Sequence, residues 1–239
     1  ELDLSFQIGY GYFGSKHSLG PSFWKSQREL GTTFLTRAGF WVRVLHATRA
    51  ANWNVVGWES LLTRLFGWLA LPPRARSSSL TFRQYRPGDA GSCRQLLADS
   101  TAHCPFRVVW SDQSIDAHLS GGGTGRTLVA ERDGVPVGFV NWHTLPFLGR
   151  TEERVAVIDL VALAHLGRRE QYQLVNAALA EMQQEGAALA LKLRIGDYAV
   201  WPLLAAGFVP RLADSYIMVT WAGEPEPIPR PSRLHLLWR

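Results

Sequence analysis

One stretch, Val155 to Val175, constrains the fold more than any other part of the chain; its sequence is VAVIDLVALAHLGRREQYQLV. It begins with an apolar, β-branched run from Val155 to Leu163, which predicts a buried strand. A short charged loop around Gly167 follows, and a helical pattern begins at Gln171. The first N–H groups of a helix lack intrahelical partners and its dipole favours negative charge. We therefore expect this strand–loop–helix junction to hold the phosphate groups of a ligand.

Composition narrows the class of protein. The chain has 239 residues and is 46% hydrophobic, which is typical of a globular protein. No apolar run reaches the roughly 18 residues of a membrane span, there is no secretory signal pattern, and two cysteines make no disulfide framework. These features predict a protein of the reducing cytoplasm that does not bind membranes.

The net charge of +5 is concentrated in the first third of the chain. Residues 1–78 carry nine Lys or Arg against four Asp or Glu, whereas residues 79–239 carry sixteen of each. The excess indicates either an anion-binding face, such as a nucleic-acid module, or a solvated surface rich in arginine. The basic residues are dispersed without a cluster, which favours the solvated surface, so nucleic acid is not an expected partner.

The clearest linker is residues 72–79, with the sequence PPRARSSS, because two prolines and three serines support no regular structure. We place a domain boundary there, which gives residues 1–71, residues 80–222 and a proline-rich tail over residues 223–239. Within residues 1–71 the patterns predict a strand over 1–8, a helix over 22–37, a strand over 40–45 and a helix over 52–66. Residues 80–222 alternate strand and helix signals, with helices predicted over 88–102, 111–119, 171–185 and 198–206, and Asp133-Gly134 predicts a hairpin.

An internal repeat links the two parts. ELDLSFQI at residues 1–8 resembles VIDLVALA at 157–164, and TRAGFWVRVL at 36–45 resembles QEGAALALKL at 184–193. LLTRLFGW at 61–68 resembles PLLAAGFV at 202–209, in the same order. The first copy begins in mid-domain, so its sheet edge would be open. We expect residues before Glu1 to complete it, or residues 1–71 to dock on the second domain or on another chain, as in a homodimer.

The second copy resembles the GNAT superfamily of acyl-CoA-dependent N-acyltransferases over roughly residues 80–222. LTFRQYRPGD is similar to that family's first strand and helix, and RTLVAERDGVPVGFVNW to its central hairpin. VIDLVALAHLGRREQYQLVNAALAEMQQEG resembles its fourth strand, pyrophosphate loop and third helix, and LALKLRIGDYAVWPLLAAGF its fifth strand and fourth helix. The resemblance implies an α/β fold with a mixed sheet (α+β), in tandem with an incomplete first copy. It also implies transfer of an acyl group, expected to be acetyl from acetyl-CoA, to a small-molecule or peptide amine.

The same resemblance implies where coenzyme A binds. The strands at 155–163 and 188–195 would splay apart and admit the pantetheine arm, which would pair with the backbone of Val161 and Leu163. The phosphates would lie at the following loop, whose implied contacts are Gly167, Arg168, Arg169, Gln171 and Tyr172. The family's two later loop glycines are replaced here, by Arg169 and Gln171 or by Gln171 and Gln173, and the added Cβ atoms hinder close approach of the backbone. Arg168 and Arg169 could compensate through charge-assisted hydrogen bonds, and Glu170 opposes this.

Two residues are the expected catalytic groups. The family often uses a tyrosine on its fourth helix to protonate the thiolate, but that position is Leu203, so Tyr198 is the nearby candidate. The base for the amine could be Asp159, His143 or Glu152; Asp159 lies in an apolar strand, where an unpaired carboxylate is costly. A paired structural role for Asp159, matching Asp3 in the first copy, is an equal alternative.

Other classes of site have weaker support. Cys93, His103 and Cys104 lack a fourth ligand at zinc spacing, so no metal site is expected. The substituted loop and the missing tyrosine also allow a second hypothesis, a catalytically inactive GNAT-like protein that binds a ligand or regulates a partner. The acyl acceptor is not identified by any motif.

Overall fold

The computed structural model describes residues 6–12, 26, 29, 31–54, 57–66, 80–121, 125–211, 215–221 and 233–237. Its centre is a nine-stranded mixed sheet with the order β1-β10-β2-β8-β7-β6-β5-β3, and β9 pairs with β2. The strands of this sheet are β1 Phe6–Tyr12, β2 Thr32–Val44, β3 Thr81–Gln84, β5 Gly125–Arg132, β6 Val135–Leu148, β7 Glu152–Ala162, β8 Leu189–Arg194, β9 Val209–Pro210 and β10 Ser215–Trp221. The α/β class with a mixed sheet is confirmed.

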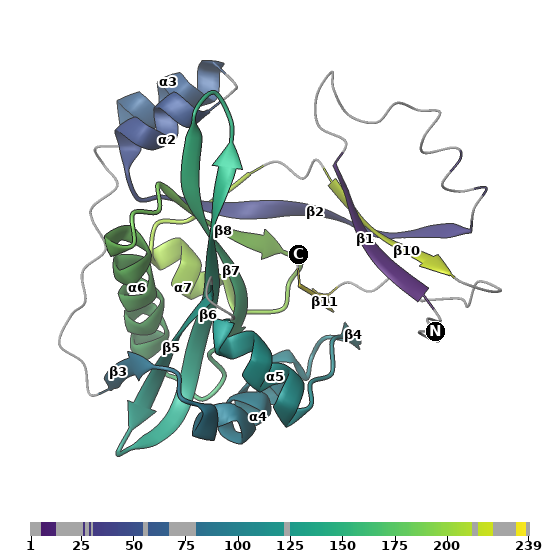
Figure 1. Cartoon of the computed structure of the whole chain (residues 1–239), viewed down its shortest axis with the longest axis vertical. Coiled ribbons are helices and arrows are strands. Elements are labelled where there is room, and N and C mark those ends of the chain that lie inside the picture. The colour runs from purple at the N-terminus through teal and green to yellow at the C-terminus, as the bar shows by residue number, and fades with distance from the viewer. Residues whose placement is uncertain are drawn as a thin grey trace.

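Helices flank the sheet, and a small two-stranded sheet pairs β4 Phe106–Arg107 with β11 Leu234–His235 (Figure 1). The helices are α2 Ala47–Trp53, α3 Gly57–Phe66, the short 3-10 helix η2 Pro87–Asp89, α4 Ala90–Thr101, α5 Asp112–Leu119, α6 Arg168–Gln184 and α7 Val200–Ala205. The predicted helices at 88–102, 111–119, 171–185 and 198–206 therefore agree with α4, α5, α6 and α7 to within a few residues.

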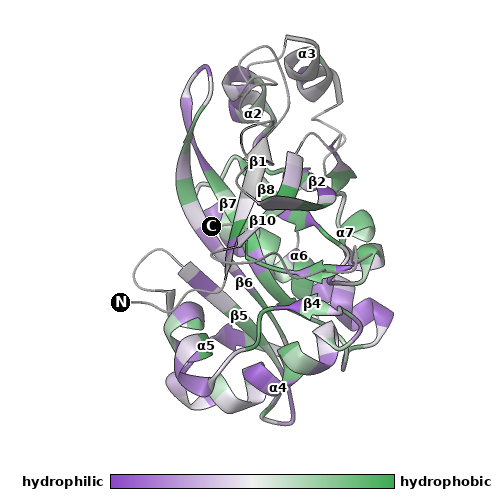
Figure 2. Ribbon diagram, turned by 90° about the vertical axis from the view of Figure 1, so that its right-hand side faces the viewer, coloured by the Kyte–Doolittle hydropathy of each residue, from purple (hydrophilic) through white to green (hydrophobic). Residues whose placement is uncertain are grey.

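The core has two main layers because successive residues of β6 point to opposite faces of the sheet. Phe139 packs with α4 and α5, whereas Val140 packs in the larger cluster that includes α6 and α7. Hydrophobic residues accordingly run along the central strands between the helices (Figure 2). Both faces of β7 are covered, which explains why its sequence is apolar almost throughout.

Residues 32–37, expected to end a helix, instead belong to β2, so that prediction is wrong. This segment is antiparallel to β10, and the later part of β2 is antiparallel to β8. Threonine, aromatic and β-branched residues fill the strand, and Leu35 and Ala38 are buried in the core. Their side chains suit a pleated surface, and pairing with β10 along this segment outweighs the weak helical pattern.

The N-terminal region shares the sheet of residues 80–222. β2 lies between β8 and β10, and β1 pairs with β10 on its other edge (Figure 1). The expected docking of the first region on the second is therefore present as strand pairing, and the sheet itself is not divided at the linker. Residues 72–79, residues 1–5 of the expected N-terminal strand and most of the tail lie outside the described residues.

Two further local expectations have clear outcomes. The helix expected over 52–66 is two helices, since α2 ends at Trp53 and Asn54 has extended backbone angles. The β5–β6 hairpin is confirmed: Asp133 and Gly134 have φ values of 53° and 79°, the left-handed turn conformation that this pair of residues favours.

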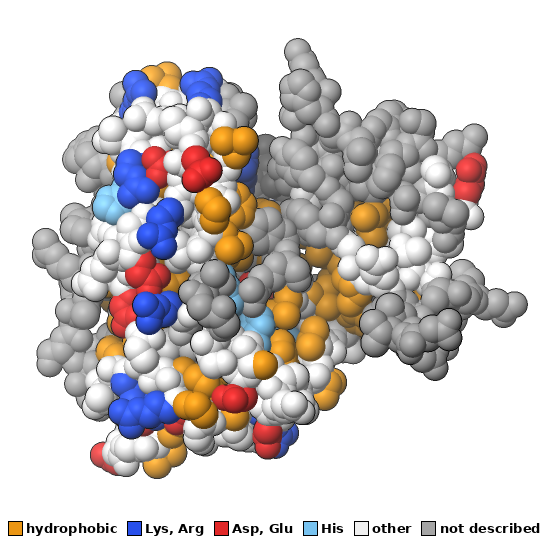
Figure 3. Space-filling model, in the orientation of Figure 1, with side chains coloured by type: hydrophobic (Ala, Val, Ile, Leu, Met, Phe, Trp, Pro, Cys, Tyr) orange, Lys and Arg blue, Asp and Glu red, His pale blue; other side chains and the backbone are white. Residues whose placement is uncertain are grey.

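Lys and Arg side chains are interspersed with Asp and Glu on the face shown in Figure 3. Among the described helices, none combines the length and the hydropathy needed to cross a membrane.

Candidate functional site

The two central parallel strands separate part-way along their length. β7 and β8 pair from Val155 with Leu189 to Ile158 with Lys192, and no further. On its other edge β7 pairs with β6, where Asn141 faces Leu160 but Trp142 faces Ile158. Asp159 is therefore the extra residue of a β-bulge, and a bulge bends its strand and ends pairing. The two strands therefore separate at Asp159 and form a fork; the family resemblance implied that this pair would splay apart, without giving the position.

Side chains satisfy backbone carbonyls at the closed end of the fork. Lys192 Nζ donates to the Asp159 carbonyl oxygen at 2.9 Å, and the Tyr198 hydroxyl donates to the Leu193 carbonyl oxygen at 2.9 Å. Lys192 also contacts the Asp197 carboxylate at 3.3 Å, and only 1% of its side chain is exposed. Because both strands have lost ladder partners here, these two donors stabilise the separated arrangement.

Tyr198 lies between β8 and α7 and packs against the large core. Burial raises the pKa of its phenol, so the hydroxyl remains protonated. Tyr198 is therefore a hydrogen-bond donor at the fork, close to Lys192, whose Nζ lies 4.9 Å from the centre of its ring.

The helix that follows β7 begins at Arg168, about one turn before the expected start at Gln171. Gly167 is the N-cap of α6, and its N–H donates to Glu170 Oε2 at 2.9 Å. Glu170 in turn accepts from Arg132 Nη2 at 2.8 Å. An internal carboxylate thus occupies the helix N-terminus, where a phosphate oxygen would be favoured.

The remaining loop residues surround this helix start. Gln171 Nε2 donates to the carbonyl oxygens of Leu163 and Leu166, at 3.2 and 2.9 Å, and so ties the loop to the end of β7. Arg168 and Arg169 are exposed, and Arg168 Cζ lies 6.0 Å from the centre of the Trp201 ring on α7. Tyr172 is partly buried against the large core.

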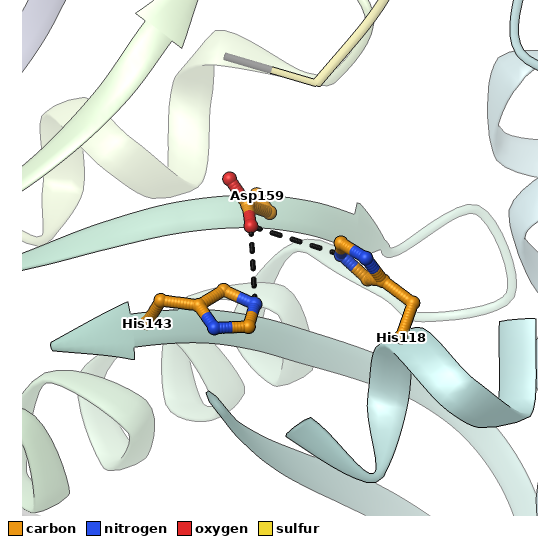
Figure 4. A group of neighbouring side chains, drawn as sticks. All are labelled: His118, His143 and Asp159. Atoms are coloured by element: carbon orange, nitrogen blue, oxygen red, sulfur yellow. Dashed lines mark ion pairs between the residues drawn. The ribbon is translucent and has the colours of Figure 1, made fainter. Parts of the chain in front are cut away.

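On the opposite face of the sheet, three side chains converge at the bulge (Figure 4). Asp159 Oδ2 lies 3.2 Å from His143 Nε2 on β6 and 3.7 Å from His118 Nε2 on α5. The exposed fractions of the three side chains are 0%, 2% and 9% for Asp159, His143 and His118. The two imidazole rings also contact one another, with centres 5.5 Å apart.

A glycine makes room for this cluster. Gly125 faces His143 across the β5–β6 pair, and a Cβ at Gly125 would lie 2.5 Å from His143 Cε1. The ring can therefore lie over β5 only because position 125 has no side chain.

The structure brings most of the sequence-predicted residues to one region. Asp159 and Val161 lie on β7 where it has separated from β8, Leu163 comes directly after β7, and Tyr198 lies at the closed end of the fork. Gly167, Arg168, Arg169, Gln171 and Tyr172 form the start of α6 and its N-cap. Glu152, the third candidate base, is exposed at the opposite end of β7 and is not near Asp159.

Sequence reasoning missed two residues of this region. Lys192 is the one charged residue in the apolar run AALALKL over residues 187–193, and a charge among apolar neighbours was a usable signal of a special role. His118 lies in the last turn of α5, and nothing in the sequence indicates that this turn meets β7.

Structural comparison places this arrangement among known folds. Saccharomyces cerevisiae N-myristoyltransferase with bound myristoyl-CoA aligns with TM-scores of 0.63 and 0.64 in two structures, at 13% identity. The alignments cover 79% and 81% of this chain, and 51% and 50% of the yeast chain. The chain has the GNAT fold. It spans about half the length of the myristoyltransferase chains it matches.

A GCN5-related N-acetyltransferase from Kribbella flavida also aligns, over 85% of this chain and 65% of its own, with a TM-score of 0.49 and 14% identity. No protein-family model matches the sequence, and no curated protein matches it. The GNAT fold is recognised from the alignment with N-myristoyltransferase, as the order of elements in the sequence predicted.

Proposed function

We propose that this protein is an N-acyltransferase that moves an acyl group, by preference acetyl, from coenzyme A to an amine. The observation that carries the proposal is the fork between β7 and β8, which opens at the Asp159 bulge and leads towards the N-terminus of α6. A yeast protein of the same fold is described with bound myristoyl-CoA. The fork gives the pantetheine arm an unpaired strand edge to bind.

The cofactor contacts follow from this placement. The β7 backbone at Val161 and Leu163 would pair with the pantetheine amides, Leu163 through its N–H because its carbonyl already accepts from Leu166 N and Gln171 Nε2. The phosphates would meet the backbone at Gly167 and the side chains of Arg168 and Arg169, with Gln171 and Tyr172 supporting the loop. Phosphate must displace the Glu170 carboxylate from the Gly167 N–H.

The proposed chemistry needs one bond made and one broken. The amine nitrogen attacks the thioester carbonyl carbon, the C–N bond forms, and the C–S bond breaks. Asp159, next to His143, would accept the amine proton, and Tyr198 would give a proton to the departing thiolate. Most of the rate enhancement would come from holding amine and thioester together.

Calorimetric titration with acetyl-CoA tests the proposal. Wild-type protein should bind, and Arg168→Glu/Arg169→Glu should bind much more weakly because two phosphate-facing positive charges become negative. Arg86→Glu/Arg150→Glu is the control, since both residues are exposed and outside the α6 loop. Absence of acetyl-CoA binding by the wild type would refute the proposal, as would equal weakening in the two double variants.

A non-catalytic binding protein is the second candidate. Two observations favour it. The Gly167 N–H already donates to the Glu170 carboxylate, and the position where the family often has its tyrosine is held by Leu203, a buried residue that has no proton to give. Binding of acetyl-CoA without transfer to any of a panel of small and peptide amines would support this alternative.

We also propose a cytoplasmic location. Cys93 and Cys104 are both free and buried, and burial raises the pKa of the Cys93 thiol to about 12. Unpaired thiols of this kind suit a reducing compartment.

A further inference from the structure

The cluster of His118, His143 and Asp159 has the composition of a metal site. Its members come from α5, β6 and β7, so three separate elements deliver their side chains to one point (Figure 4). One ligand atom from each residue lies within 4.8 Å of the others. All three side chains are at least nine-tenths buried.

The distances suit a first-row transition metal. Ligands about 2.0 to 2.2 Å from a tetrahedral zinc ion lie roughly 3.3 to 3.6 Å from one another. The two contacts of Asp159 Oδ2, at 3.2 Å to His143 Nε2 and 3.7 Å to His118 Nε2, fall on either side of that range. Small side-chain movements would therefore bring the three atoms into a shared coordination sphere.

The donor set selects the class of ion. Two imidazole nitrogens and one carboxylate oxygen suit Zn²⁺ and neighbouring divalent transition metals, whereas Mg²⁺ and Ca²⁺ prefer oxygen ligands throughout. His118 lies in the last turn of α5, where the helix dipole favours a positive charge. Gly125 fixes the space for the His143 ring against β5.

We propose that His118, His143 and Asp159 bind a divalent transition-metal ion such as Zn²⁺. The expectation from cysteine spacing was that no metal site is present, and this set uses none of the residues considered there. Binding of the metal does not depend on acyl transfer. If Asp159 also serves as the proton acceptor of the proposed reaction, a bound ion occupies that carboxylate and inhibits transfer.

The test uses untagged, chelator-treated full-length protein and Co²⁺ as the probe. We expect uptake of one equivalent of Co²⁺ with visible absorption bands of a low-coordinate site, and displacement of the bands by Zn²⁺. Uptake of less than a tenth of an equivalent, or spectra of hexa-aquo Co²⁺ alone, would overturn the proposal.

Variants assign the ligands. His118→Gln and Asp159→Asn should each lower Co²⁺ affinity by at least tenfold. His165→Gln is the matched control, because His165 makes an exposed pair with Asp99 at 2.8 Å and should leave affinity unchanged. Equal affinity in His118→Gln, Asp159→Asn and wild type would contradict the assignment.

The wild-type protein gives a second measurement in case a variant fails to fold. X-ray absorption of the zinc-loaded protein should show two imidazole ligands and no sulfur. Sulfur ligation would place the ion on Cys93 or Cys104 and would overturn the proposal. Acetyl-CoA titration of the same metal-free sample tests the proposed function separately, so failure of one proposal does not imply failure of the other.

Discussion

Replacing Glu170 by Gln should strengthen acetyl-CoA binding, although it weakens a helix cap. Glu170 Oε2 accepts from the Gly167 N–H at 2.9 Å, at the position proposed for a phosphate oxygen. Both groups are anionic, so they compete for this N–H and repel one another. Glutamine keeps the shape and a hydrogen-bond acceptor but has no charge.

The size of the effect follows from the geometry. A phosphate bound at the Gly167 N–H would lie about 4 to 6 Å from the Glu170 carboxylate, where two unit charges repel by about 1 kcal/mol at the dielectric constant of water. That energy corresponds to a roughly fivefold change in the dissociation constant. Glu→Gln also releases Arg132, whose side chain is 43% exposed, to approach the phosphates. We therefore expect acetyl-CoA to bind roughly three- to tenfold more tightly.

Isothermal titration calorimetry at low and high salt measures this prediction. The gain should shrink at high salt, because salt screens partly exposed charges. Glu152→Gln removes the same charge from an exposed position at the far end of β7 and should leave affinity unchanged. Weaker binding by Glu170→Gln, or an equal gain in both variants, would show that the phosphates do not lie at Gly167.

Three further predictions concern stability. Gly125→Ala should lower the free energy of unfolding by about 1 to 3 kcal/mol, because its Cβ would lie 2.5 Å from His143 Cε1. Gly91→Ala, on an open face of α4, should instead raise stability by roughly 0.5 to 1 kcal/mol, and urea unfolding compares the two. Lys192→Met should lower the free energy of unfolding by about 3 to 5 kcal/mol, because it leaves Asp197 buried without this partner. Arg94 forms an exposed pair with Asp112, so Arg94→Met should lower it by less than about 1 kcal/mol in the same assay. The Arg83 guanidinium holds the pKa of Asp89 below its ordinary value, so Asp89 contributes stability above about pH 4 that is lost as the pH falls through its folded pKa. In Asp89→Asn the free energy of unfolding should therefore fall less steeply as the pH is lowered below about 4. The same steepness in the variant and the wild type would contradict the assignment.

Features set by neighbouring residues could be predicted from the sequence. The Asp133-Gly134 turn fixes the β5–β6 hairpin, because both residues adopt the left-handed conformation with little steric cost. The strand–loop–helix unit of β7 and α6 could also be predicted, because an apolar run is followed directly by a short loop and a helical pattern. Both are local, and both position the candidate site.

Features set by distant residues could not be predicted. β2 is a strand because β8 and β10 flank it, and both lie far away in the sequence. The bulge at Asp159 is a property of the register between β6 and β7, which no single-strand pattern contains. His118 joins Asp159 only through the packing of α5 on the sheet. The side chains of the candidate site are thus brought together by tertiary contacts, whereas the strand and helix that carry them follow from local sequence patterns.

The place of β2 in the sheet has a consequence for biosynthesis. A ribosome releases Thr32–Val44 about 145 residues before β8, so at roughly 5 to 20 residues per second this strand waits on the order of ten seconds for its partner. During that interval it exposes two pairing edges and an apolar surface to neighbouring nascent chains. A gene fragment that encodes only residues 80–239 would leave β8 and β10 without the strand that joins them. Expression of that fragment together with a peptide of residues 31–46 should then yield more of the fragment in soluble form than expression of the fragment alone.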